Sequence, residues 1–318
     1  MVAEASLRVV FFGTPAFAVP TLEALIASRH VVVGVVTQPD RPRGRGQKTT
    51  HAPVKARALT AGVPVVQPDS LKDAAFVAAL GALGADLGVV AAYGKILTDA
   101  VLATPRLGLI NVHASILPRY RGAAPIHRAV IDGERETGVT IMRMVKALDA
   151  GPMLAVARRA IGPDDTSEEV ERDLARLGAD LSVSTIDQLV EGRLNEVAQR
   201  ESDATYAPRL TRDDGRIDWA WPAERIHNLI RGLHPWPHAF TFLGQQRFIL
   251  LRSTPSREPS NAPAGTLLEA GGDRLRVAAG TGVVNVLGLQ AEGKRPMSVR
   301  EFLAGHPLLP GAVFHAHA

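Results

Sequence analysis

Short apolar runs alternate with helical patterns through the first 190 residues, and this alternation limits the fold more than any other feature of the sequence. The runs Leu7 to Phe12, Val31 to Thr37 and Leu87 to Ala92 are continuous and rich in β-branched residues, which predicts strands buried on both faces. Between the first two runs, residues 17–28 repeat apolar residues at helical spacing. Strands separated by helices predict an α/β fold with a Rossmann-like, mostly parallel sheet over residues 1–190.

Other segments of this region follow the same pattern. We expect further strands over residues 63–66, 109–112 and 140–145, and helices after Pro53, over 76–83 and over 167–190. The last helix has a clear start signal, because Thr166 and Ser167 precede Glu168 and Glu169 in the order of a capping box.

The pattern changes after residue 190. Residues 191–206 form a polar stretch that we interpret as a linker, and a helix is expected over 223–231. Short apolar runs then occur over 248–251, 265–268, 275–278 and 283–287, separated by glycine-containing turns. Such spacing predicts a second domain over residues 207–318, smaller than the first and built as a β-barrel.

Charge and cysteine content narrow the classes of function. The net charge is +4, and residues 207–318 hold 13 Lys and Arg against 9 Asp and Glu, so all of the excess lies in the predicted barrel. This excess fits contact with a polyanion such as RNA, although so small a surplus also arises by chance.

The chain has no cysteine, which excludes disulfides, thiolate zinc sites and cysteine nucleophiles. No signal peptide or long apolar stretch is apparent, so we expect a cytoplasmic protein without a membrane span.

The strongest local signal is the string NVHASILPRYRGAAP over residues 111–125. Asn111 and His113 are two positions apart on a predicted strand, so they point to the same face while Val112 turns to the core. The carboxyl end of a parallel strand is where open α/β sheets bind ligands. An amide and an imidazolium can both donate to an oxygen that becomes negative during acyl transfer. The alternative is that this Asn-x-His pair is structural.

An acyl transfer of this kind needs a third group to orient the histidine or to move protons. Asp149 follows the strand expected over 140–145 and lies in a turn-rich loop with Gly151 and Pro152. A carboxylate there would be able to hold the charge or tautomer of His113, and the alternative is a plain turn aspartate. Ser115 lacks the G-x-S-x-G elbow of a serine hydrolase, and residues 115–118 are expected to form a loop.

Two further segments are candidates for binding. Residues 37–55 carry a local charge of +4, and their glycines and prolines make a helix or a strand unexpected; the charged residues are Asp40, Arg41, Arg43, Arg45, Lys48 and Lys55. This loop can bind the phosphates of RNA or of a small substrate, or it is simply solvated. The strand ending at Ala92 leads into Tyr93, whose neighbouring backbone would suit a flat heterocycle unless Tyr93 is only a strand-end aromatic. Gly13 alone, without G-x-G-x-x-G, gives little support for a dinucleotide site.

Together, these strings resemble the methionyl-tRNA formyltransferase family, a branch of the folate-dependent formyltransferase superfamily, over nearly the whole chain. The resemblance is carried in order by FFGTPAFAVPTLEAL, TQPDRPRGRG, VVAAYGKIL, NVHASILPRYRGAAPI, ETGVTIM, LDAGPML, TYAPRL, RIDWAWPA and GKRPMSVREFL. It implies 10-formyltetrahydrofolate as the formyl donor and initiator Met-tRNA as the acceptor. It also implies that the second domain is an OB-like barrel that binds tRNA.

The resemblance implies roles for individual residues. The catalytic residues would be Asn111, His113 and Asp149. Folate would be bound by residues of two segments, which are Ser115, Ile116, Leu117 and Pro118, and Tyr93, Gly94, Lys95, Ile96 and Leu97. RNA would contact Arg41, Arg43, Arg45 and Lys48, of which Arg45 ranks first. We assign no metal ligands and expect a monomer.

The sequence departs from the family pattern at three of these positions, and two rival hypotheses stay open. Ala114 stands where many members have Gly, and Ala150 and Pro152 replace the frequent Thr and Asp, so we assign no role to the last two. One rival is a formyltransferase that acts on a small amine. The other is a protein of a different class, either a Rossmann oxidoreductase or an RNA-binding module without catalysis.

Overall fold

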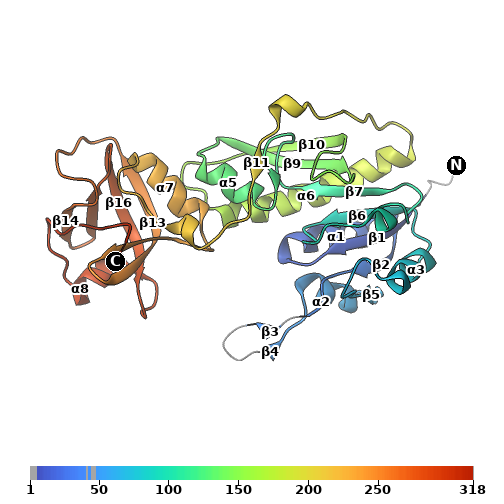
Figure 1. Ribbon diagram of the computed structural model, residues 1–318, viewed down its shortest axis with the longest axis horizontal. Coiled ribbons are helices and arrows are strands. Elements are labelled where there is room, and N and C mark those ends of the chain that lie inside the picture. The colour runs from blue at the N-terminus through green and yellow to red at the C-terminus, as the bar shows by residue number, and fades with distance from the viewer. Residues whose placement is uncertain (1–5, 41, 44–47, 318) are drawn as a thin grey trace. The chain divides into compact units, whose positions relative to one another are not determined.

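The computed structural model describes residues 6–40, 42–43 and 48–317, and the chain forms two compact units. The first unit comprises residues 1–122, 137–159 and 171–206, and the second comprises 123–136, 160–170 and 207–318. Each unit has its own sheet (Figure 1).

The sheet of the first unit has seven strands in the order β10-β9-β7-β6-β1-β2-β5. Pairs β1/β2, β1/β6, β6/β7 and β2/β5 are parallel, whereas β9 runs antiparallel to β7. This confirms the mostly parallel, Rossmann-like sheet. The strands are β1 (Arg8–Gly13), β2 (Val31–Val36), β5 (Val65–Val66), β6 (Leu87–Ala91), β7 (Leu109–His113), β9 (Glu136–Arg143) and β10 (Met153–Ala160).

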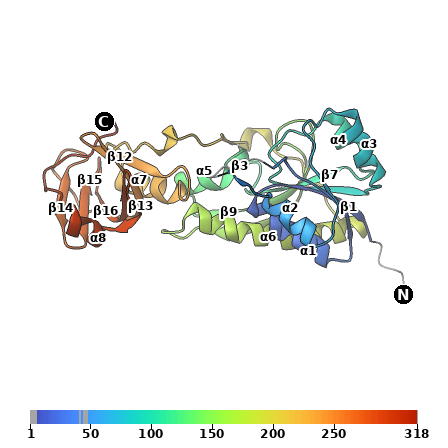
Figure 2. The same cartoon turned by 90° about the horizontal axis from the view of Figure 1, so that it is seen from below.

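Helices cover both faces of this sheet, as the alternating pattern predicted. Val10, Phe12 and Val90 pack on one face against residues of α3 (Ala74–Ala82) and α4 (Asp99–Leu102). On the opposite face, Val112 of β7 packs against Gly178 of α6 (Ser167–Val190). Figure 2 shows α1 (Val19–Ala27), α2 (Pro53–Thr60) and α6 on the side away from α3 and α4.

Helix α6 has the predicted bounds and begins with the predicted capping box. The Thr166 hydroxyl accepts a hydrogen bond from the Glu169 N–H at 3.3 Å, and the Glu169 carboxylate accepts one from the Thr166 N–H at 2.9 Å. These bonds satisfy backbone donors that a helix start otherwise leaves unpaired. The backbone hydrogen bond from Thr166 holds the pKa of the Glu169 carboxyl below its usual value.

The second unit contains a six-stranded antiparallel sheet that closes on itself. The main strand order is β12-β13-β16-β15-β14, with β17 beside β16. The segment around Val313 and His315 bridges both edges, because His315 pairs with Phe242 of β12 and Val313 pairs with Thr266 before β14. This closure is that of the small barrel expected from the sequence. The strands are β12 (Ala239–Leu243), β13 (Gln246–Ser256), β14 (Leu267–Gly271), β15 (Arg274–Ala278), β16 (Val283–Ala291) and β17 (Met297–Ser298).

The helices α5 (Pro125–Ile131), α7 (Ala223–Gly232) and α8 (Val299–Gly305) belong to this second unit. Helix α7 contributes Ile226 and Ile230 to the barrel core. A Cβ on Gly232 would lie 2.5 Å from the Ile131 side chain, so α5 and α7 approach each other at a position where only glycine fits.

Several elements differ from the sequence-based expectation. Strand β9 begins at Glu136 and ends at Arg143, earlier than the predicted 140–145. Strand β10 was not predicted, because most of its residues are only partly buried or exposed and include Arg158 and Arg159. Helices α4, α5 and α8 and strand β17 were also missed, since each is short, and strand β12 was missed because it follows a cluster of proline and histidine. The remaining short elements are β8 (Arg121–Gly122), β11 (Tyr206–Ala207) and the 3₁₀ turns Ala16–Ala18, Glu201–Asp203 and Asp213–Gly215.

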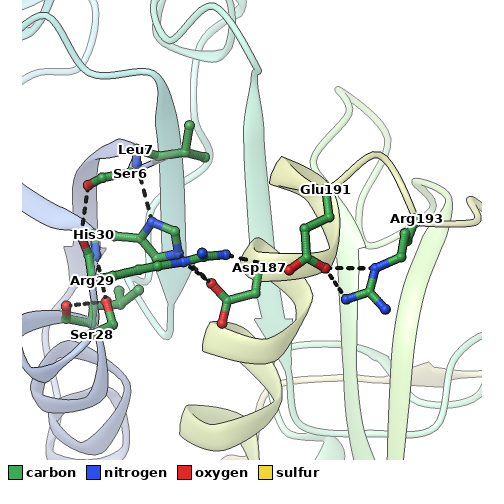
Figure 3. A network of polar contacts seen from close by, with 9 residues as sticks. Ser6, Leu7, Ser28, Arg29, His30, Asp187, Glu191 and Arg193 are labelled. Carbon is green, nitrogen blue, oxygen red and sulfur yellow. Dashed lines mark hydrogen bonds and ion pairs between the residues drawn. The ribbon is translucent and has the colours of Figure 1, made fainter. Parts of the chain in front are cut away.

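A polar network joins the start of β1, the start of β2 and the end of α6 (Figure 3). The buried ring of His30 accepts a hydrogen bond from the Leu7 N–H at Nδ1, 3.2 Å away, and its Nε2 lies 3.2 Å from Asp187 Oδ1. Arg29 binds the same carboxylate oxygen at 2.7 Å. Burial lowers the pKa of His30 despite the neighbouring Asp187, so the ring is held neutral.

Candidate active site

Asn111 and His113 lie next to each other on the same face of β7. Asn111 is opposite Val90 of β6 and Met142 of β9, and His113 is opposite Thr140. Val112 between them is buried, whereas Asn111 is partly exposed. This partial exposure means that the amide N–H groups of Asn111 can be reached by a ligand.

The imidazole of His113 is held by a backbone carbonyl on one side and faces a carboxylate on the other. Its Nε2 lies 3.0 Å from the carbonyl oxygen of Tyr120, and because a carbonyl only accepts, we assign a hydrogen to Nε2. Its Nδ1 lies 3.7 Å from Oδ2 of Asp149, which is an ion-pair distance but longer than a hydrogen bond. A second proton on this ring therefore lies on Nδ1, beside the carboxylate.

Asp149 reaches His113 from a loop that turns back across the unit. Since β9 is antiparallel to β7, its last residue, Arg143, pairs near the amino end of β7, and residues 144–152 must return to place Asp149 beside His113. Asp149 has a φ of 47°, in the left-handed region, which costs on the order of 1–3 kcal/mol for such a residue and must be held by its surroundings. One holding contact is the N–H of Gly122, 2.9 Å from Asp149 Oδ2.

Backbone groups of residues 118–122 and 205 support both side chains, and the sequence did not reveal them. Tyr120 has a φ of 60°, and its N–H donates to the hydroxyl of Thr205 at 2.9 Å. The Arg121 N–H donates to the Thr205 carbonyl at 2.8 Å. The string YRG is visible in the sequence, but only the fold shows that its carbonyl and amide groups contact His113 and Asp149.

The loop from Ser115 to Pro118 is present as expected, and side-chain hydroxyls of Ser115 and Thr140 stabilise it. The Ser115 hydroxyl donates to the carbonyl of Arg119 at 2.6 Å. Thr140 of β9 donates to the Ser115 carbonyl at 2.7 Å and accepts from the Leu117 N–H at 3.1 Å. Ser115 and Leu117 are buried, whereas Ile116 and Pro118 are partly exposed. A ligand at this loop would therefore meet Ile116, Pro118 and backbone groups.

Residues Tyr93 to Leu97 follow β6 and lie at the same edge of the sheet as the end of β7. The Tyr93 carbonyl accepts hydrogen bonds from Gln38 Nε2 at 2.7 Å and from Thr14 Oγ1 at 3.2 Å. The Tyr93 ring is buried edge-on to Phe12, and burial raises its pKa to about 12. Thus this ring is part of the core, as the strand-end alternative held.

The other residues of this segment divide into inner and outer positions. Lys95 donates to the carbonyls of Pro68 and Asp69 at 3.2 and 3.1 Å, and Leu97 is buried. Gly94 is exposed, and the side chain of Ile96 is 85 % exposed. The surface that this segment offers to a ligand therefore consists of Gly94 and Ile96.

The arginine-rich segment contains a short antiparallel pair, which corrects our expectation that it forms no strand. Strand β3 (Pro42–Arg43) pairs with β4 (Lys48–Thr49), and Arg43 is opposite Lys48. The glycines and prolines shorten the ladder to two residues on each side without preventing it. Arg41 and Arg45 lie outside the described residues.

A cluster of described side chains joins the two ends of this segment. Asp40 Oδ2 lies 2.5 Å from Lys55 Nζ and 3.0 Å from His51 Nδ1, and Gln67 Nε2 donates to Oδ1 at 3.2 Å. The hydrogen bond from Lys55 holds the pKa of the Asp40 carboxyl well below its usual range. Since Asp40 and Lys55 neutralise each other, the segment's positive charge is that of Arg41, Arg43, Arg45 and Lys48.

Two further features of the described residues bear on metal binding and on membrane insertion. Among the residues that the structure describes, no group of three or more His, Asp or Glu side chains is arranged to hold a metal ion. In the same part of the chain, no helix is long and apolar enough to cross a membrane.

Comparison with known proteins decides the family. A formyl transferase profile matches residues 7–186, and a formyl transferase C-terminal domain profile matches residues 209–307. The chain is 46 % identical over 308 residues to the methionyl-tRNA formyltransferase of Caldanaerobacter subterraneus subsp. tengcongensis, covering 96 % of this chain and 99 % of that protein. The chain belongs to the methionyl-tRNA formyltransferase family. The corresponding enzyme of Heliobacterium modesticaldum is 48 % identical over 316 residues, covering 97 % of this chain and all of that one.

Solved structures agree with this family assignment at the level of the fold. The N-formyltransferase from Helicobacter canadensis, in complex with folinic acid and dTDP-3-aminofucose, superposes with a TM-score of 0.66 at 16 % identity. The match covers 88 % of this chain and 98 % of that one. The resemblance inferred from the sequence strings is thus confirmed, and membership of this family argues against the oxidoreductase and the non-catalytic RNA-binding module.

Proposed function

We propose that this chain transfers the formyl group of 10-formyltetrahydrofolate to the α-amine of initiator methionyl-tRNA. The observation that carries the proposal is the position of His113, with Nδ1 facing Asp149 and with Asn111 beside it on β7. The near-complete match to methionyl-tRNA formyltransferases supports the choice of substrates.

In the proposed reaction the amine nitrogen attacks the formyl carbon, and a new C–N bond forms. The formyl oxygen becomes negative, and the Asn111 amide and the Nδ1–H of protonated His113 stabilise it. The Asp149 carboxylate lies beside Nδ1 of that ring and leaves its N–H free for the formyl oxygen, because 3.7 Å is longer than a hydrogen bond. When the intermediate collapses, the bond to N10 of the folate breaks, the amine loses a proton and N10 gains one, so charge and atoms balance.

The donor is proposed to lie at the carboxyl ends of β6 and β7. The exposed backbone at Gly94 and the side chain of Ile96 would contact the pterin on one side. Ile116, Pro118 and the backbone of their loop would contact it on the other. The buried Ser115, Leu117, Tyr93 and Leu97, together with Lys95 through its bonds to backbone carbonyls, would keep the two segments in place rather than contact the folate ring with their side chains.

The acceptor RNA is proposed to contact the basic segment and the barrel. The sequence supplies Arg41, Arg43, Arg45 and Lys48 in the basic segment, and residues 207–318 hold an excess of basic over acidic residues. We propose that the catalytic domain spans residues 1–190, that 191–206 link it to the tRNA-binding domain 207–318, and that the protein acts as a monomer in the cytoplasm.

The test is to incubate the protein with 10-formyltetrahydrofolate and charged initiator tRNA, and then to release the aminoacyl group and identify it by mass spectrometry. We expect N-formylmethionine. Formyl transfer to a small amine such as a nucleotide-linked amino sugar, with none to Met-tRNA, would overturn the proposed acceptor.

The same assay tests the basic segment. Arg45→Ala should weaken the use of Met-tRNA as acceptor far more than the binding of folate. An equal loss of tRNA use and of folate binding would contradict the role of the basic segment.

A further inference from the structure

Gln199 lies in the polar stretch after α6, and its side chain bridges the loop that carries Asp149. Its Nε2 lies 2.8 Å from the carbonyl oxygen of Asp149 and 2.8 Å from that of Gly151. A primary amide has two N–H donors, so both are used on this one loop. Gln199 thus contacts the carbonyls on either side of Ala150, directly beside the carboxylate that faces His113.

The amide can point only one way, because Arg121 fixes its other end. Arg121 Nε donates to Oε1 of Gln199 at 3.0 Å, and a guanidinium never accepts. Arg121 is itself 2 % exposed and donates from Nη1 to both carboxylate oxygens of Glu201, at 2.9 and 3.1 Å. The buried, ion-paired guanidinium therefore orients Gln199 so that its N–H groups face the Asp149 loop.

Arg121 also lies between the two backbone groups that contact the catalytic pair. The carbonyl of Tyr120 accepts from His113, and the N–H of Gly122 donates to Asp149. The side chain of Arg121 extends from the same three-residue segment to Gln199. One connected set of contacts thus reaches the imidazole, the carboxylate and the loop that bears the carboxylate.

The backbone of Asp149 needs such support. Its φ of 47° is a conformation that L residues with a side chain rarely adopt. A loop released from its hydrogen bonds would relax toward a more common conformation and carry the carboxylate away from His113. The two N–H groups of Gln199 act on the carbonyls that move in such a change.

We propose that Gln199 is a positioning residue for formyl transfer, which holds the Asp149 carboxylate at its place beside His113 and is itself oriented by Arg121. This inference rests on the proposed function, because the consequence for turnover requires that Asp149 serve the transfer. It assigns a role in catalysis to a stretch that the sequence presented only as a linker.

The first test compares steady-state kinetics of Gln199→Leu and Gln199→Glu with the wild type. Leucine removes all polar atoms, whereas glutamate keeps the acceptor for Arg121 and removes only the two donors. We expect kcat to fall about 10- to 100-fold in both, since small misplacements of catalytic groups have effects of this size. KM for folate and for Met-tRNA should stay within about twofold. Loss confined to thermal stability, with kcat unchanged, would overturn the proposal.

A matched control comes from the same stretch. Asn195 is an exposed amide four positions before Gln199, and Asn195→Ala should leave kcat and both KM values unchanged. A fall in kcat in this variant as large as in Gln199→Leu would mean that any change in the stretch is harmful, and would overturn a specific role for Gln199.

A double-mutant cycle tests whether Gln199 acts through Asp149. In an Asp149→Asn variant the contribution of the carboxylate to kcat is already lost. Adding Gln199→Leu to this variant should therefore lower kcat by less than about twofold further. A full additional loss, equal to that in the single variant, would show that Gln199 acts independently of Asp149 and would contradict the proposal.

A measurement without turnover separates this inference from the proposed function. The Gly122 N–H donates to Asp149 Oδ2, so its hydrogen–deuterium exchange should become faster in Gln199→Leu and stay unchanged in Asn195→Ala. Faster exchange in a protein that transfers no formyl group would support the positioning and reject the function. Unchanged exchange and unchanged kcat in an active protein would reject the positioning alone.

Discussion

The two units of the chain use the ends of their strands in opposite ways. In the first unit, the carboxyl ends of β1, β2 and β6 lead into Thr14, Gln38 and Tyr93, and the carboxyl end of β7 carries Asn111 and His113. In the second, the strand edges are joined by residues 313–315, so that the sheet closes around an apolar core. An open sheet leaves polar groups at its end for chemistry, whereas a closed barrel uses its backbone groups for its own stability. Substitutions at the strand ends of the first unit should therefore lower kcat, whereas substitutions in the barrel core should lower the free energy of unfolding.

The largest expected effect is on the stability of the barrel. Phe314 is 1 % exposed, and its ring centroid lies 5.8 Å from that of Trp219 and 5.7 Å from that of Phe248. Phe314→Ala should lower the free energy of unfolding by about 3–5 kcal/mol, measured by denaturant titration. Leu309, 75 % exposed, gives the control, because Leu309→Ala should change it by less than about 0.5 kcal/mol. A large loss of kcat in folded Phe314→Ala would contradict the expectation that the barrel core contributes to stability and not to turnover.

The second largest effect is expected on kcat, from a substitution at the end of β7 that leaves the free energy of unfolding unchanged. Asn111→Ala removes one proposed donor to the oxyanion, so we expect kcat to fall about 10²- to 10³-fold. Single-turnover formylation at saturating substrates measures this, with thermal unfolding and folate binding as controls. Near wild-type turnover would remove Asn111 from the mechanism, and a matching loss of stability would make it a structural residue.

A smaller effect is expected where charge is partly buried at the base of the basic segment. Lys55→Met leaves the Asp40 carboxylate, 13 % exposed, without its ammonium partner, and should lower the free energy of unfolding by about 1–3 kcal/mol. The control is Lys146→Met, since Lys146 is 84 % exposed in its pair with Asp99 and such pairs contribute about 0–1 kcal/mol. Equal effects would show that burial does not matter at Asp40.

The smallest predicted difference concerns pH. Burial holds the pKa of His30 below its ordinary value of 6.5, so the unfolded chain takes up a proton at a higher pH than the folded one. His30 therefore destabilises the fold increasingly as the pH falls below about 6.5. His30→Asn keeps an acceptor for the Leu7 N–H, and its free energy of unfolding should decline less than that of the wild type between pH 7 and pH 5. A steeper decline would contradict this sign.

Much of the first unit was predictable because its strands are continuous apolar runs and α6 has an explicit start signal. The partly exposed β10 was harder, since alternation on an edge strand resembles a loop with scattered apolar residues. In the second unit the core strands were visible but β12 was not, because it follows a cluster of proline and histidine over 234–238. Its pairing partner at His315 lies too far along the chain for any local pattern to indicate.

In the candidate site, too, some residues could be predicted from a local sequence pattern, and others are placed only by the folded backbone. Asn111 and His113 follow from period-two spacing at a strand end, and Asp149 follows from a turn after a strand. Tyr120, Gly122 and Thr205 contribute carbonyl, amide and hydroxyl groups whose direction depends on the folded backbone, so no residue pattern marks them. In turn, the sequence could not tell that the Tyr93 ring faces the core, since a strand-end residue points either way.

Closure of the barrel by residues 313–315 has a consequence for synthesis of the protein. Strand β12 and the residue before β14 obtain these partners only after residues 313–315 have been translated and have left the exit tunnel. The sheet of the first unit needs no residue from that region, so it can form while the barrel is still an open sheet with two unpaired edges. During this interval the growing chain exposes strand edges that invite aggregation, and a chaperone bound there would protect it until the ring is complete.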